Sequence, residues 1–309
     1  MLKLDIKQNK AYTIDFQKKY LQNLIDARDE IINSGIKVTI RQKTKHLYVS
    51  KANKKFLQKR LTNKTLILLM RMKPKQQRKV ISLFKRKFPS LHNQKTKIYQ
   101  FFKYIFITKG YNELDTVEKQ LFYINLKINS CIYCNRNYIF NVNENGHIKG
   151  QIDHFYPKGK YPYFAMSFYN FIPVCESCNK VKHEYDTTDE SKVLIHPYER
   201  KDEKIFSIGI NSVDDFYYKI NNDDLLKKLY IDKIYNIGHK DILEELYIKF
   251  FQQDTKDHFN ILKKEFKSLG FNDKDIYRYL TNGYLDDKEF HKRAFSKVIY
   301  DIIKSEFKL

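Results

Sequence analysis

Four cysteines, arranged as two identical pairs, are the most chemically specific feature of this sequence. Cys131 pairs with Cys134 and Cys175 with Cys178, and 40 residues separate the two pairs. Two intervening residues let one tight turn present both thiolates to the same metal ion, at about 2.3 Å for zinc. Two such pairs supply the four ligands of a tetrahedral site. The spacing therefore predicts a structural Zn²⁺ site.

Two other uses of these cysteines agree less well with the sequence. Disulfides suit a chain of the reducing cytosol poorly, and a redox Cys-x-x-Cys motif needs no second pair. A zinc ion would fix both ends of the 40-residue segment between the pairs. Residues in that segment and just after it would then be held in register by a small metal-closed core.

Side chains suited to catalysis and metal binding lie in that segment and directly after it. Asp153 and His154 are adjacent, and Asn170 follows 16 residues after His154. Asn179 and His183 come after the last cysteine and are four residues apart. This spacing places Asn179 and His183 on one face of a helix.

In this order and spacing, residues 131 to 186 resemble the HNH endonucleases. These are ββα-metal (His-Me finger) nucleases with a zinc-bound cysteine pair at each end. The resemblance rests on Asp153-His154 at the end of a strand, on Asn170, and on Cys-x-x-Cys-Asn-x-x-Lys at the start of a helix. It makes the chain an H-N-N variant, because Asn179 stands where the family often has histidine.

A looser resemblance concerns HNH nucleases of bacterial anti-phage defence systems. Residues 135–138, 153–162, 167–170 and 196–199 look like the corresponding runs of these nucleases. The Septu type, which works with an ATPase, is one example. The resemblance implies antiviral defence as the setting and an ATPase as a partner.

The residue types are those that phosphodiester hydrolysis requires. A water must be deprotonated in line with the leaving oxygen, and a cation must offset the charge on the phosphorane and the departing 3′ oxygen. His154 is neutral near pH 7 and is a suitable general base. Asp153, on the other side of an extended backbone, would hold a divalent ion. A packed or zinc-bound histidine is the alternative for His154, but four cysteines already satisfy one zinc.

The remaining site residues would complete the metal site and position the base. One carboxylate holds Mg²⁺ weakly, so we expect Asn179 or His183 to add a ligand. His183 would act as the second helix histidine does in colicin DNases, and Mn²⁺, Ni²⁺ or Zn²⁺ would then support activity as well as Mg²⁺. Asn170 would tie its loop back by side-chain hydrogen bonds and so orient His154. An ordinary Asx turn is the alternative for Asn170.

Basic residues near these positions are candidate nucleic-acid contacts. Arg136 follows the first cysteine pair and has a planar fork suited to phosphate. Four lysines would hold phosphates on either side of the scissile bond, with a solvated surface lysine as the alternative for each. They are Lys158, Lys160, Lys180 and Lys182.

The elements that position the site follow from the hydrophobic pattern. Helices are predicted at residues 13–34, 54–71, 74–87 and 95–106, with another that begins at the Asp115 cap and runs to Leu126. A basic β-hairpin is predicted from residues 36–40 and 47–49. Glycine and proline punctuation after Cys131 indicates loops and strands. Short strands at 204–210 and 216–220 precede further helices from about residue 240, including 274–280 and 287–307.

These patterns predict an α+β, mostly helical fold in three parts. Residues 1–129 would form a basic, mainly helical nucleic-acid-binding region. Residues 130–200 would form the small zinc-stabilised ββα-metal nuclease core. Residues 201–309 would form short strands and a C-terminal helical region that docks a partner.

The positive charge is concentrated in the first part of the chain. The 309 residues hold 58 Lys and Arg against 36 Asp and Glu, a formal net charge of +22. Up to Ser130 there are 30 basic and 8 acidic residues, whereas from Cys131 onward there are 28 of each. This asymmetry predicts an anionic partner of the N-terminal region, with nucleic acid favoured over an acidic membrane surface.

Neither membrane insertion nor export is expected. The longest apolar run in the basic region, residues 66–70, is far shorter than the roughly 20 residues that span a bilayer. The first five residues form no apolar signal region, so we expect the protein in the cytoplasm. With 42% hydrophobic residues the chain can bury real cores, which excludes a peptide, a fibre or a disordered tail.

The sequence as a whole therefore predicts a metal-dependent endonuclease, with DNA as the favoured substrate. A non-catalytic zinc-ribbon module that binds nucleic acid or assembles a complex is the main alternative, and it would need only the cysteines and the basic surface. An RNA-directed nuclease toxin would use the same metal site. The sequence has no Gly-x-x-x-x-Gly-Lys loop by which the chain could gate itself, so a separate regulator, such as an ATPase, is expected on the C-terminal helices.

Overall fold

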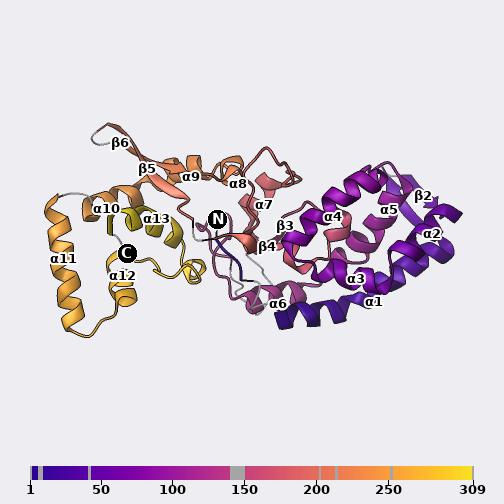
Figure 1. Cartoon of the computed structure of the whole chain (residues 1–309), viewed down its shortest axis with the longest axis horizontal. Coiled ribbons are helices and arrows are strands. Elements are labelled where there is room, and N and C mark those ends of the chain that lie inside the picture. Colours follow the sequence, from indigo (N-terminus) through magenta and orange to yellow (C-terminus); the bar gives the residue numbers. More distant parts are fainter. Residues whose placement is uncertain are drawn as a thin grey trace.

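The computed structural model describes residues 2–5, 10–40, 43–139, 150–201, 203–212, 215–250 and 253–307. Figure 1 shows an elongated molecule with helices of the N-terminal part at one end and helices of the C-terminal part at the other. Between them lie β3 (Gly150–His154), β4 (Phe171–Cys175) and α7 (Glu176–Lys182). The expected α+β, mostly helical class is confirmed.

The N-terminal part is built on a long helix, α1 (Lys10–Ser34), whose buried face has the helical spacing that the sequence predicts. Phe16 on this face packs edge-on against Phe168 and Phe171 of the middle unit, with ring centroids 6.0 and 5.8 Å apart. Burying each such ring stabilises the fold by about 1.5–3 kcal/mol. This aromatic contact fixes the basic helices against the strands that carry the site.

Two predicted helices of this part have different limits in the structure. The helix expected at residues 54–71 is divided into α2 (Lys51–Arg60) and α3 (Asn63–Arg71), because Thr62 caps the second helix by accepting a hydrogen bond from the Thr65 amide. The helix expected at 95–106 begins later, as α5 (Lys97–Lys103), and continues into a π-helical turn at Tyr104–Thr108. The predicted helices at 74–87 and from the Asp115 cap are confirmed as α4 (Pro74–Lys87) and α6 (Thr116–Leu126).

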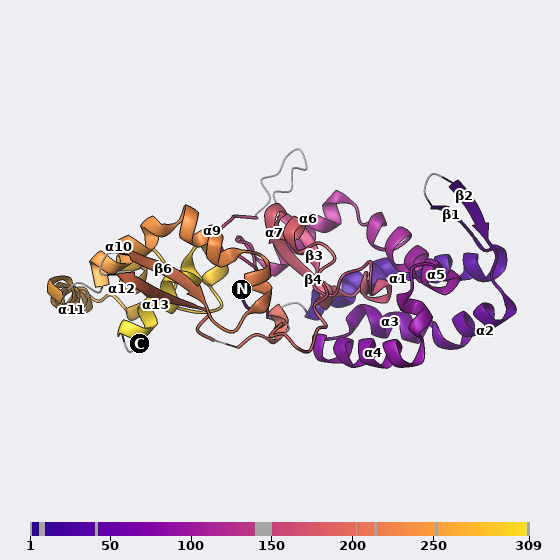
Figure 2. The ribbon, with the colours of Figure 1, turned by 90° about the horizontal axis from the view of Figure 1, so that it is seen from above.

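The predicted basic hairpin is present with a different second strand. β1 (Ile36–Ile40) pairs antiparallel with β2 (Lys43–Leu47), and Ile36 lies opposite Leu47. The expected second strand at 47–49 was therefore wrong, because the strand begins four residues earlier and ends at Leu47. Gly35 enters the hairpin at a φ of +73°, and a Cβ there would collide with the Leu47 carbonyl oxygen. In Figure 2 the hairpin projects from one edge of the N-terminal part, and α4 lies at the opposite edge.

The middle unit consists of two antiparallel strands followed directly by a helix. Gly150 lies opposite Cys175 at one end of the β3–β4 pair, and His154 lies opposite Phe171 at the other. α7 begins one residue after β4. The two ends of one short sheet therefore carry different groups, a cysteine at one and the Asp-His pair at the other.

The C-terminal part begins with β5 (Phe206–Ser212) and β6 (Asp215–Ile220), close to the predicted strands. The sequence did not predict α8 (Asp224–Lys228) or α9 (Ile231–Gly238). The helix expected at 287–307 begins only at Ser296. The helices that follow α9 are α10 (Lys240–Phe250), α11 (Gln253–Ser268), α12 (Asp273–Thr281) and α13 (Ser296–Phe307). Within the described ranges, no helix has the length and apolar content to cross a bilayer.

The turn that carries the first cysteine pair contacts segments that are distant from it in sequence. The Leu2 amide donates to the Ile132 carbonyl, and the Tyr235 hydroxyl of α9 donates to the Cys134 carbonyl, each at 2.7 Å. The chain just before α13 donates a backbone hydrogen bond of 2.7 Å to the Asn135 carbonyl. One short turn thus holds segments from the beginning and the end of the chain.

Candidate functional site

The two cysteine pairs come together in the middle unit, as their spacing predicts. All four cysteines are buried free thiols, and their sulfurs lie within 4.8 Å of one another. The sulfurs of Cys134 and Cys175 are 4.0 Å apart. A tetrahedral zinc with bonds of about 2.3 Å would hold its sulfurs about 3.8 Å apart, so the cluster fits a zinc ion.

Local structure explains how each pair is presented. Asn135 follows the first pair with a φ of +49°, which closes the turn and lets the Arg136 amide donate to the Cys134 sulfur at 3.4 Å. Cys175 is the N-cap residue of α7, so Cys178 falls in the first turn of that helix. Burial raises the pKa of the Cys131 thiol, and a dication is the group that would stabilise four buried thiolates.

A pocket of about 290 Å³ lies at the other end of the β3–β4 pair. It is lined by four of the five predicted catalytic residues, namely Asp153, His154, Asn179 and His183. Lys158 and Lys180, two predicted phosphate contacts, also line it. The structure therefore gathers donors from β3, from α7 and from the loop after β3 around one cavity.

His154 is held in a defined orientation beneath this pocket. Its Nε2 donates to the Ala165 carbonyl oxygen at 3.0 Å, which leaves the lone pair on Nδ1. Its ring packs edge-on against Tyr111 and Phe171, with centroids 4.5 and 5.3 Å apart. Burial, followed by the positive charges of Lys158 and Lys182, lowers the pKa of His154 to about 3. The imidazole is therefore neutral at physiological pH.

Asn170 lies outside the pocket and makes the hydrogen bonds expected of a residue that ties a loop. Its side-chain oxygen accepts from the Tyr156 amide at 2.8 Å, and its side-chain nitrogen donates to the carbonyls of Tyr156 and Phe164. Its backbone carbonyl accepts from the Phe155 amide at 3.0 Å. Asn170 thus fastens both the residues just after His154 and those just before Ala165, which accepts the His154 hydrogen bond.

Asp153 has two buried partners in this structure. Tyr133 donates to its Oδ2 at 2.5 Å, and Lys182 lies 3.1 Å from Oδ1 and 3.0 Å from Oδ2. Lys182 also donates to the His154 carbonyl at 2.7 Å. Its side chain is fully buried, which corrects the prediction that Lys182 contacts a phosphate. It cannot face a substrate because its ammonium group is enclosed by Asp153 and the β3 backbone.

The two candidate ligands on α7 are placed differently from the helical-face prediction. The helix ends at Lys182, and His183 is its C-cap residue, exposed and at a φ of +42°. Asn179 lies on the helix and donates from Nδ2 to Gln151 Oε1 at 2.7 Å, which leaves Asn179 Oδ1 as an oxygen donor. Both residues still line the pocket.

Two of the other predicted phosphate contacts, Lys158 and Lys180, line the pocket but have different neighbours. Lys158 lies 4.0 Å from the ring centroid of Tyr111, and burial lowers its pKa. Lys180 forms an exposed ion pair with Glu176.

Lys160 and Arg136 do not line the pocket. Lys160 lies 3.7 Å from Asp186. Arg136 lies on the C-terminal side of the cysteine turn, where burial and then its charge lower the pKa of His239. Of the five predicted phosphate contacts, Lys158 and Lys180 are the two that line the pocket.

Sequence reasoning missed several neighbours of the site. Tyr111 lines the pocket from a short 3-10 turn, Glu184 lines it beyond α7, and Tyr133 reaches Asp153 from within the first cysteine pair. A fourth neighbour, Gln151, accepts the hydrogen bond of Asn179. The sequence could have indicated Gln151, because it lies two residues before Asp153 on the same strand and hence on the same face.

Comparison with protein-family models, with curated proteins and with solved structures finds no match to this chain.

Proposed function

We propose that this protein is a metal-dependent endonuclease that hydrolyses phosphodiester bonds of nucleic acid. The observation that carries the proposal is the pocket that gathers His154, Asp153, Asn179 and His183, with Lys158 and Lys180 at its wall. A neutral histidine, oxygen and nitrogen metal donors and ammonium groups around one cavity are the groups that this reaction requires.

The donors fit a divalent ion in kind. Asp153, Asn179 and His183 would hold it through a carboxylate oxygen, an amide oxygen and an imidazole nitrogen, a set suited to Mg²⁺ or Mn²⁺. Such an ion would supply positive charge against that of the phosphorane and the departing oxygen. Asp153 would have to exchange at least one of its bonds to Lys182 and Tyr133 to take part.

The protein's own groups account for the proton transfer. Nδ1 of His154 takes a proton from a water whose oxygen attacks phosphorus, and the bond from phosphorus to the 3′ oxygen breaks. Solvent protonates the departing oxygen. A histidine with a pKa of about 3 is a weak base. A phosphate at Lys158 would offset that lysine's charge and so raise the pKa of His154 toward the efficient range.

The test is cleavage of labelled single-stranded and duplex DNA and of RNA by the purified, zinc-loaded protein with Mg²⁺ or Mn²⁺. His154→Ala should lower the cleavage rate by about 10²–10⁴-fold, the usual value of a general base. His258→Ala is the matched control, because His258 is an exposed histidine of α11, far along the chain from the pocket. Zinc content and melting temperature verify that each variant is folded.

Two outcomes would contradict the proposal. One is equal cleavage by the His154→Ala variant. The other is wild-type protein that binds nucleic acid but cleaves none of the three substrates with either ion. The second outcome is what the non-catalytic zinc-ribbon module predicts.

A further inference from the structure

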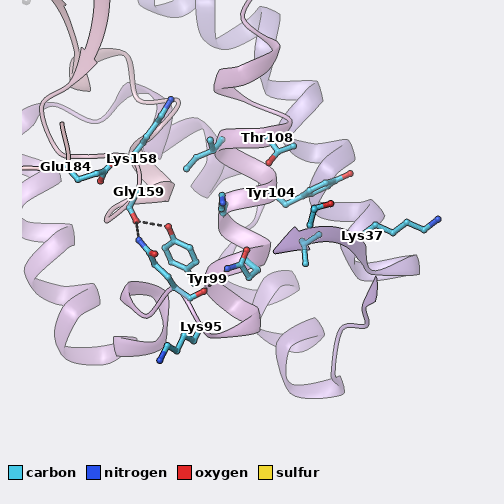
Figure 3. Close-up of a pocket in the computed structure, with 14 residues that line it drawn as sticks. Lys37, Lys95, Tyr99, Tyr104, Thr108, Lys158, Gly159 and Glu184 are labelled. Carbon is cyan, nitrogen blue, oxygen red and sulfur yellow. Dashed lines mark hydrogen bonds between the residues drawn. The ribbon is translucent and has the colours of Figure 1, made fainter. Parts of the chain in front are cut away.

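A second, larger hollow of about 980 Å³ adjoins the pocket. It lies between β1, α5 with its π-helical turn, and the loop at residues 158–159, and we call it the α5 groove (Figure 3). Lys158 and Glu184 line both the α5 groove and the pocket. The two hollows therefore adjoin at these two side chains, and an extended ligand would have to pass Lys158 and Glu184 to reach from one to the other.

The α5 groove has a strong positive charge. Lys37, Lys95, Lys103 and Lys158 line it, and Glu184 is the one acid among its described lining residues. For none of the four lysines does the described part of the chain supply an ion-pair partner within 4 Å. Their charges are therefore available to an anionic ligand.

The arrangement of the ammonium groups favours an extended anion over a small one. Figure 3 shows Lys37, Lys95 and Lys158 on different elements around the hollow, with side chains that point in different directions, and the Lys158 ammonium lies over the ring of Tyr111. A single phosphate cannot contact ammonium groups that diverge in this way. A polymer with repeated phosphates can meet them one after another.

The inner surface of the groove offers groups for unpaired bases. Gln94 and Gln100 donate from Nε2 to backbone carbonyls and so offer their Oε1 atoms as acceptors. The ring of Tyr104 is fixed because its hydroxyl donates to Glu30 at 2.9 Å. In a duplex the base edges are reached by a helix or ribbon that enters a groove of the DNA, which a concave surface cannot do. A single strand can turn its bases into such a hollow and stack them on an aromatic ring.

The loop that joins groove and pocket is fixed by α5 and by the chain just before it. The Gly159 carbonyl accepts from the Tyr99 hydroxyl at 2.6 Å and from Gln94 Nε2 at 3.3 Å. A Cβ at Gly159 would lie 2.7 Å from the Glu184 carboxylate, so the loop passes close to that side chain. Lys158 is therefore held at one place relative to both hollows.

We propose that the α5 groove binds a single-stranded stretch of nucleic acid and leads it into the pocket. This assignment rests on the proposed function in one respect, since it takes the pocket as the place of cleavage. Binding of the strand in the α5 groove does not depend on cleavage, so it can be measured with protein that does not cleave.

The test compares two triple variants that each remove three positive charges. The groove variant changes Lys37, Lys95 and Lys103 to Gln. The α4 variant changes Lys75, Lys79 and Lys87 to Gln, because these lysines are exposed on α4, which lines neither hollow. Both are made in the full-length His154→Ala protein, and the anisotropy of a labelled 20-nucleotide single strand and of the matching duplex is measured from low to high salt.

The groove variant should bind the single strand about tenfold more weakly near physiological salt. Its slope of log affinity against log salt should fall by about 2, since each lost phosphate contact removes about 0.7. The α4 variant should lose less than about threefold. Equal weakening by the two variants, no weakening by the groove variant, or a groove-dependent preference for the duplex would each overturn the proposal.

The two proposals fail in different measurements. Groove-dependent binding by a wild-type protein that cleaves nothing would support the α5 groove and overturn the nuclease. Cleavage by wild type together with unchanged binding by the groove variant would support the nuclease and overturn the groove.

Discussion

The cysteine cluster and the pocket occupy opposite ends of the same two-stranded sheet, yet they are built in opposite ways. The cluster joins four identical, buried donors that converge on one point. The pocket joins donors of different kinds, of which Asp153 and Asn179 already bond to other protein groups. A closed set of like donors suits a permanent ion. A mixed set with exchangeable partners suits a site whose contents change during a reaction.

The sharpest test of this contrast is to remove one of the four cysteines that would hold a permanent ion. Cys134→Ser should abolish stoichiometric zinc and lower the free energy of unfolding by at least about 5 kcal/mol, because zinc binding and folding are coupled at such sites. Metal analysis and thermal unfolding measure both effects. Ser177→Ala, an exposed change between the second pair of cysteines, should leave both unchanged. A stable Cys134→Ser protein without metal would show that the cluster is no zinc site.

The next effect concerns the pocket's own buried charges. Lys182→Met should lower the free energy of unfolding by about 3–5 kcal/mol, because it leaves the Asp153 carboxylate buried with one hydroxyl partner. Zinc content should stay the same, which separates the two ends of the sheet.

The double variant Lys182→Met/Asp153→Leu should regain most of that stability, since buried ion pairs are often replaced by apolar residues at little cost. Denaturant unfolding measures both variants. A Lys182→Met protein as stable as wild type would contradict the buried ion pair between Lys182 and Asp153.

A smaller effect depends on pH. The pKa of His154 is about 3 in the folded protein and about 6.5 in an unfolded chain, so the unfolded state binds more protons between these values. Stability is therefore complete above pH 6.5 and is lost as pH falls, by about 2 kcal/mol at pH 5.

Unfolding of His154→Gln between pH 5 and 8, at constant zinc content, should show a shallower slope than that of wild type. His258→Gln, a change of an exposed histidine, should keep the wild-type slope. Identical slopes in all three proteins would show that His154 is not buried in its neutral form.

The smallest effect is expected at the rim of the pocket. Lys180 and Glu176 form an exposed pair, so Lys180→Ala should change stability by less than about 0.5 kcal/mol. Substrate binding should weaken by about threefold through the lost phosphate contact. Lys192→Ala breaks a comparable exposed pair with Asp189 away from the pocket, and it should leave substrate binding unchanged. Equal effects of the two variants on substrate binding would show that Lys180 does not contact the substrate.

Sequence was most informative where spacing alone decides the outcome. The two Cys-x-x-Cys pairs predicted the cluster, the apolar period predicted α1, and Asp115 predicted the start of α6. These features are local or depend on a chemistry that few residues perform. The break between α2 and α3 escaped because Thr62, a capping residue, lies within an otherwise helical pattern.

The sequence could not predict features that depend on packing between distant segments. Lys182 looks like a surface lysine until α7 packs on β3 and its ammonium meets Asp153. The direction of the Lys182 side chain is fixed by the packing of α7 on β3, which the local pattern does not encode.

The turn after the first cysteine pair has a consequence for how the chain matures. Its partners are far away in sequence: Cys175 is 41 residues from Cys134, Tyr235 is 101 residues away, and Lys297 bonds to Asn135 across 162. Contacts of such separation form slowly and late. During synthesis the cysteines of this turn emerge long before the helices that cover them. The segments that enclose the turn after the first cysteine pair are therefore complete only after α13 has been synthesised.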